Sequence, residues 1–142
     1  MKTKKKRRAG SLLAVPLLAV GLTACGSTVS TSTFKGESHA VAQRVSDYQS
    51  DIGAASEKKL CNEDLSSAVR RRLNAAPGGC EEALKRQLGS IDDYEATVEE
   101  VAVNGATATA VVKSTWSGKL RDATLELVKE GGGWRIAGAT LK

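Results

Sequence analysis

The chain has 142 residues, of which 41% are hydrophobic and 4% aromatic, and its formal net charge is +5. Six of its 21 Lys and Arg residues lie among the first eight positions, so a body without this start holds 15 cations against 16 Asp and Glu, a net charge of −1. Because the excess positive charge lies in these first residues and not in the rest of the chain, net charge does not indicate nucleic-acid binding. We expect no nucleic-acid partner. Residues 38–142 are enough for one domain with a single core.

The first 24 residues have the pattern of a secretory signal peptide. A basic start is followed by residues 9–24, which carry no charge and end in small side chains. A retained transmembrane helix is the alternative, but a span needs about 20 apolar residues, and this run is shorter and contains Pro16. The polar residues 26–33 that follow do not extend it. We therefore expect residues 1–24 to be removed.

The end of this leader, Leu22-Thr23-Ala24-Cys25, resembles the bacterial lipobox, Leu-x-(small)-Cys. An ordinary cleavage site prefers small residues at the first and third positions before the cut, and Leu22 is bulky. The resemblance implies that Cys25 receives a diacylglycerol, that the chain is cut before it, and that its new amino group is often acylated, for example with palmitate. The alternative is a cut elsewhere, such as after Gly21, which leaves Cys25 as a stray thiol.

Lipidation at Cys25 predicts where the protein lies. Two or more acyl chains anchor a protein stably, whereas one binds reversibly. The expected partner is therefore the lipid bilayer, and the expected location is the extracytoplasmic face of the cell membrane. Residues 25–37 begin with an uncharged Ser/Thr/Gly-rich stretch, which predicts a flexible tether before the domain at 38–142.

Cys61 and Cys80 remain as an even pair in an exported chain, which favours a disulfide. The Gly-rich loop before Cys80 lets the chain double back. A redox-active pair is the alternative, but such pairs are usually Cys-x-x-Cys. A zinc site would need further ligands, and the single histidine, His39, is distant in sequence. We expect a structural disulfide, with no metal and no cofactor.

The spacing of apolar residues predicts helices up to residue 88. Ser38 is the expected cap of the first helix, whose apolar stripe includes Val45 and Tyr48 and which ends at Gly53. Ser66 is expected to open the third helix. Its Arg70-Arg71-Arg72 run indicates a solvated face, with an anion contact as the alternative. The expected helices cover residues 38–52, 55–61, 66–76 and 81–88.

After Ser90 the pattern alternates as in strands. Asn104-Gly105 is a strong hairpin signal, and Glu99-Glu100 interrupts the alternation, which predicts a bulge. Helices followed by an antiparallel meander predict an α+β domain, with N-terminal helices packed on a curved four-stranded antiparallel sheet. The expected strands cover residues 94–103, 106–116, 120–129 and 134–141.

Three segments carry a resemblance to a known family. They are Leu-Ser-Ser-Ala-Val-Arg-Arg-Arg-Leu at 65–73, Cys-Glu-Glu-Ala-Leu at 80–84, and Leu-Val-Lys-Glu-Gly-Gly-Gly-Trp-Arg-Ile at 127–136. Their order resembles the small actinobacterial lipoproteins of the nuclear transport factor 2-like (NTF2-like, cystatin-like cone) superfamily. The resemblance implies a curved sheet wrapped around a helix to form a cone with a pocket, which Tyr48, Trp116 and Trp134 are expected to line.

That superfamily includes isomerases, dehydratases and cyclases as well as proteins that only bind. Its catalytic isomerases place acids and a tyrosine in the cone, and the candidates here are Tyr48 with Asp92, Asp93 or Glu95. These acids lie at a strand start, where exposed acids are ordinary, and no catalytic residues are assigned. We expect a non-catalytic, membrane-anchored module that binds a protein, a cell-wall component or a small apolar molecule. An isomerase- or dehydratase-like enzyme and a structural role in the cell envelope are the alternatives.

Overall fold

The computed structural model describes residues 31–142. The expected signal peptide, the lipidation site Cys25 and residues 26–30 of the tether lie outside the described residues. None of the helices in residues 31–142 is both long and apolar enough to span a bilayer. The elements are α1 (Gly36–Gly53), α2 (Glu57–Lys59), the π-helical turn η1 (Leu60–Asp64), α3 (Ser67–Asn74), α4 (Gly79–Leu88), β1 (Tyr94–Asn104), β2 (Thr107–Trp116), β3 (Lys119–Glu130) and β4 (Gly133–Leu141).

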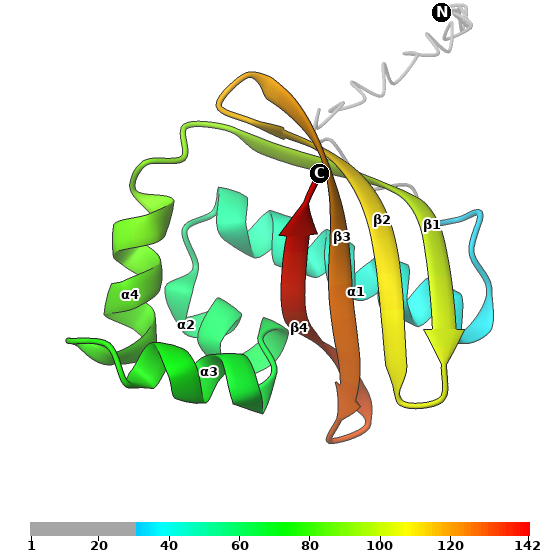
Figure 1. Ribbon diagram of the computed structural model, residues 1–142, viewed down its shortest axis with the longest axis horizontal. Helices are drawn as coiled ribbons and strands as arrows, with labels where there is room; N and C mark the ends of the chain where they lie inside the picture. Colours follow the sequence, from blue (N-terminus) through cyan, green and yellow to red (C-terminus); the bar gives the residue numbers. More distant parts are fainter. Residues whose placement is uncertain (1–30) are drawn as a thin grey trace, which may run out of the picture.

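The four strands form one antiparallel meander in the order β1-β2-β3-β4, as the sequence predicts. The sheet is curved, and α1 crosses its inner face, while α3 and α4 lie beyond the β4 edge (Figure 1). The β2–β3 hairpin extends past the end of β4 and bends toward the side where α4 lies (Figure 1). This arrangement confirms the α+β class and the helices packed on a curved sheet.

The predicted bulge is present in β1. The pairing with β2 shifts between Val98 and Glu100, so that Glu99 has no partner in the register. The extra residue returns Val101 to the inner face with Val98, and a bulge also bends the strand. A second register shift, between β3 and β4 at Glu126 and Leu127, adds to the curvature of the sheet.

The predicted helix ends are only partly confirmed. Ser66 caps α3 as predicted, because its hydroxyl accepts a hydrogen bond from the Val69 amide at 3.3 Å. The expected cap at Ser38 is wrong: α1 begins at Gly36, and Lys35 occupies the cap position. The expected second helix is only one turn long before the chain widens into η1. That widening turns Leu60, Cys61 and Asp64 inward together.

One core lies between α1 and the sheet. Its sheet side includes alternate residues of β3, Ala123, Leu125 and Leu127, all of which are buried as the alternation predicts, together with inner-face residues of the other three strands. The expected disulfide joins Cys61 in η1 to Cys80 in α4, with 2.03 Å between the Sγ atoms. It ties the segment that holds α3 and α4 to the rest of the helical layer.

Candidate functional site

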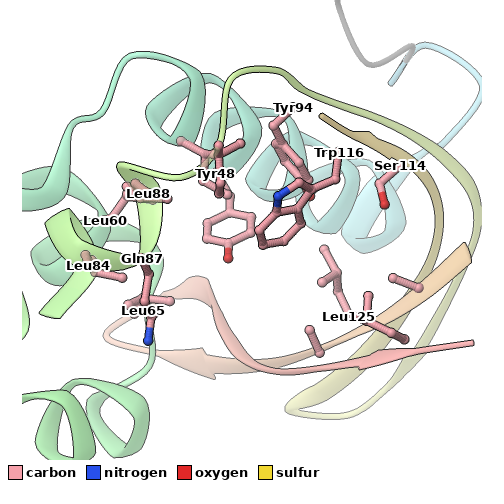
Figure 2. Close-up of a pocket in the computed structure, with 15 residues that line it drawn as sticks. Tyr48, Leu60, Leu65, Leu84, Gln87, Leu88, Tyr94, Ser114, Trp116 and Leu125 are labelled. Atoms are coloured by element: carbon pink, nitrogen blue, oxygen red, sulfur yellow. The ribbon is translucent and has the colours of Figure 1, made fainter. Parts of the chain in front are cut away.

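A cavity of about 130 Å³ opens at the end of the cone, between α1, α4 and the sheet. Its walls follow from helix and strand periodicity, because residues three or four apart on a helix, and two apart on a strand, share one face. Figure 2 shows the lining side chains converging on a common space. They are Tyr48 and Ile52 from α1, Leu60 and Leu65, Leu84, Gln87 and Leu88 from α4, Ile91, and Tyr94, Ser114, Trp116, Ala123, Leu125, Ala139 and Leu141 from the sheet.

Three aromatic side chains form one wall of the cavity. The rings of Tyr94 and Trp116 meet edge to face, with centroids 6.2 Å apart and an interplanar angle of 83°. Tyr48 lies beside them, and its hydroxyl points into the cavity (Figure 2). Burial raises the pKa of both tyrosine hydroxyls above the ordinary value. Both phenols are therefore neutral at physiological pH and can donate a hydrogen bond to a ligand.

The mouth of the cavity is partly open to solvent. Trp116 is 39% exposed and Leu141 is 54% exposed, and Gln87 and Ala139 on the same rim are also exposed. Large apolar side chains at an opening leave apolar surface in water unless something covers it. The mouth therefore has the character of an entry point for an apolar molecule.

The polar groups of the lining are few. Gln87 contributes an amide on the rim, and Ser114 contributes a buried hydroxyl that donates to the Arg121 carbonyl at 3.2 Å. Within residues 31–142, no carboxylate is among the residues that line the cavity. The lining can bury an apolar group and orient it through four side chains, the hydroxyls of Tyr48, Tyr94 and Ser114 and the amide of Gln87.

The residues expected at the site are only partly brought together. Tyr48 and Trp116 line the cavity, but Trp134 does not. Trp134 is buried at the other end of the cone, where its Nε1 donates to the Glu37 carboxylate at 2.9 Å. Asp92, Asp93 and Glu95 are exposed and do not line the cavity. The pairing of Tyr48 with an acid inside the cone, which the enzyme alternative requires, is therefore not made by these three acids.

An ion pair between a partly exposed arginine and a fully buried acid lies beside the cavity wall. The Arg44 Nη1 and Asp64 Oδ1 atoms are 2.6 Å apart, and the Asp64 side chain is fully buried. Among the described residues, the other carboxylate oxygen and the Arg44 Nε atom have no hydrogen-bond partner. Burial raises the pKa of Asp64 to about 6, against the opposing effect of Arg44 and with a smaller contribution from the nearby Asp51 carboxyl.

The ion pair lies outside the cavity lining and would not contact a ligand bound in the cavity. Asp64 lies between Cys61 and Leu65, and its charge contributes to raising the pKa of Tyr48, yet it is not among the lining residues. Sequence reasoning missed it because Asn-Glu-Asp at 62–64 has the appearance of a solvated run. Arg44 and Asp64 are 20 residues apart on different elements, so no local spacing indicates the pair.

Solved structures with a similar arrangement of helices and strands identify the fold. An NTF-2 like protein of unknown function from Silicibacter pomeroyi DSS-3 superposes with a TM-score of 0.52 at 17% identity, covering 72% of this chain and 93% of that one. The chain has the NTF2-like fold. An NTF2-like protein of unknown function from Shewanella baltica OS155 is similar at a TM-score of 0.47 and 17% identity, covering 75% of this chain and 94% of the other.

Sequence comparison adds a second finding. A family model described as "Putative lumazine-binding" matches residues 80–141, which run from α4 to β4 of the NTF2-like fold. That segment supplies α4 and every strand that lines the cavity. No curated protein matches the chain.

Proposed function

We propose that this protein is a non-catalytic binding module whose NTF2-like cone takes up a small, mostly apolar molecule. The observation that carries the proposal is the cavity itself, with an aromatic wall of Tyr48, Tyr94 and Trp116 and an open, apolar mouth. Its volume of about 130 Å³ is close to the roughly 150 Å³ of an engineered apolar cavity that binds benzene. A small aromatic ring system or a short alkyl segment is therefore the size of group that the cavity buries.

The chemistry of the lining supports binding over catalysis. General acid–base catalysis most often uses a histidine or a carboxylate within hydrogen-bond reach of the reacting atom. The described lining contains neither, and burial raises the pKa of its two tyrosines, which makes them weaker proton donors. Lumazine, named in the description of the matching family model, is a flat ring system. A flat ring suits the space beside Tyr94 and Trp116, since aromatic pairs gain about 0.5–1.5 kcal/mol beyond burial.

A substitution at the mouth tests this proposal. Ala139 is exposed, lines the cavity and has its side chain on the inner face of β4. In Ala139→Phe the added phenyl group is expected to occupy the cavity and to abolish saturable indole binding, measured by amide chemical shifts in NMR titrations. Ala102→Phe is the matched control, because Ala102 is an exposed strand alanine outside the cavity lining, and indole should bind this variant like the wild type.

Two results would overturn the proposal. One is indole binding that is unchanged in Ala139→Phe, which would place the ligand elsewhere. The other is wild-type protein that shows no saturable binding of indole or of short alkyl compounds.

We also propose that lipid on Cys25 holds the module at the outer face of the cell membrane. Support comes from Leu22-Thr23-Ala24-Cys25 at the end of an apolar leader. In the native host, wild-type protein is expected in the membrane fraction after a high-salt wash, and Cys25→Ala is expected to be released from it. Equal distribution of the two proteins between fractions would contradict the anchor.

A further inference from the structure

We infer that the cavity binds a single-chain amphiphile with an anionic head group, whose apolar part enters the cone while Lys119 and Arg121 hold the head at the mouth. This inference rests on the proposed binding function and names the class of ligand. It follows from how the β2–β3 hairpin distributes its charges, and from the size and polarity of the cavity below it.

Strand register places the two cations on the cavity side of the hairpin. Trp116 pairs with Lys119, and Ser114 pairs with Arg121. Directly paired residues of antiparallel strands project from the same face of the sheet, and both Trp116 and Ser114 line the cavity. Lys119 and Arg121 therefore continue the inner face beyond the mouth, where the hairpin bends toward α4 (Figure 1).

The intervening residues put the other charges of the hairpin on the opposite face. Lys113 pairs with Asp122 across the strands, and its Nζ lies 2.7 Å from a Glu99 carboxylate oxygen. Both acids raise the pKa of Lys113. On the outer face, Lys113 is therefore paired with an acid of the same face. On the inner face, by contrast, neither Lys119 nor Arg121 has an ion pair with any residue from 31 to 142.

Two acids near the hairpin oppose this attraction. Asp92 and Asp93 are exposed in the segment before β1, and the Asp93 carbonyl accepts a hydrogen bond from the Ser117 amide at 2.9 Å. The Asp93 carboxylate is therefore near the turn and weakens the positive potential there. Because the side chains of this region are exposed, the two cations are expected to contribute modestly to affinity, in line with solvated ion pairs.

The cavity limits the apolar part of the ligand to one chain or ring. A volume of about 130 Å³ suits a short alkyl segment, and burying the methylenes of that segment favours binding. Exposed apolar groups at the rim, Leu141 and Trp116, can cover the part of the chain that emerges. An anionic head then lies at the hairpin, where Arg121 can pair with a carboxylate through two parallel hydrogen bonds.

The test compares octanoate with 1-octanol, which share a chain and differ in charge. Isothermal titration calorimetry of the wild type is expected to show octanoate binding about fivefold more tightly at low salt. In the double variant Lys119→Gln/Arg121→Gln this preference should disappear, while octanol affinity stays the same. Lys113→Gln is the matched control on the outer face and should keep the preference. Asp93→Asn should strengthen octanoate binding.

The outcomes separate the inference from the function on which it rests. Equal affinity for the two probes in the wild type, or a preference that persists in the double variant, overturns the inference and leaves the binding cavity in place. Indole binding without binding of either alkyl probe also overturns it. If neither the alkyl probes nor indole bind, the proposed function fails as well.

Discussion

Replacing Arg44 with Met is expected to lower the free energy of unfolding by about 3–5 kcal/mol at pH 7, because the fully buried Asp64 carboxylate then loses its counter-charge. The ion pair itself need not be strongly stabilising, since burying two charges costs about as much as their attraction returns. The large cost in stability comes from leaving the buried Asp64 carboxyl without its partner charge. Urea denaturation followed by circular dichroism measures the difference.

A double variant separates these two contributions. In Arg44→Met/Asp64→Leu both charges are gone, and most of the lost stability should return. Arg86→Met is the matched control, because Arg86 is 51% exposed in its pair with Glu82, which is 49% exposed, and this substitution should cost less than about 1 kcal/mol. A loss below 1 kcal/mol in Arg44→Met would show that the pair is solvated in the native protein.

Removing the disulfide with Cys61→Ala/Cys80→Ala is expected to lower the free energy of unfolding by about 3 kcal/mol in the chain-entropy model, given its sequence separation of 19. The unfolded chain gains the freedom of a loop that contains α3 and the start of α4. Denaturation curves of the variant and the wild type measure this loss.

Reduced wild-type protein is the control, because it removes the same cross-link without changing the side chains. The two losses should agree to within about 1 kcal/mol. Unchanged wild-type stability after reduction would mean that the fold does not depend on the cross-link, and would weaken the argument for an oxidising compartment.

Much of the sheet was predictable because its signals are local. Asn104-Gly105 fixes the first hairpin, and the doubled Glu99-Glu100 marks the bulge, since a second outward residue in a row cannot keep the alternation. Ser66 is a cap that needs only its own hydroxyl and an amide three residues on. The disulfide followed from the even pair of cysteines.

The cavity was less predictable because it depends on where the elements meet. Trp134 was expected to line the cavity with Tyr48. An inward-facing side chain can lie at either end of the cone, and Trp134 lies at the opposite end, where its Nε1 donates to the Glu37 carboxylate of α1. Tyr94 was not singled out, since only the pairing with Trp116 brings it to the mouth. Asp64 is buried through the π-helical turn, which no residue pattern in 60–64 announces.

A crystal structure of the protein grown with indole tests the central claim most directly. The account predicts one indole ring inside the cone, in contact with Tyr48, Tyr94 and Trp116. Indole located only on the outer face of the sheet, or an interior that stays closed at saturating indole, would contradict it.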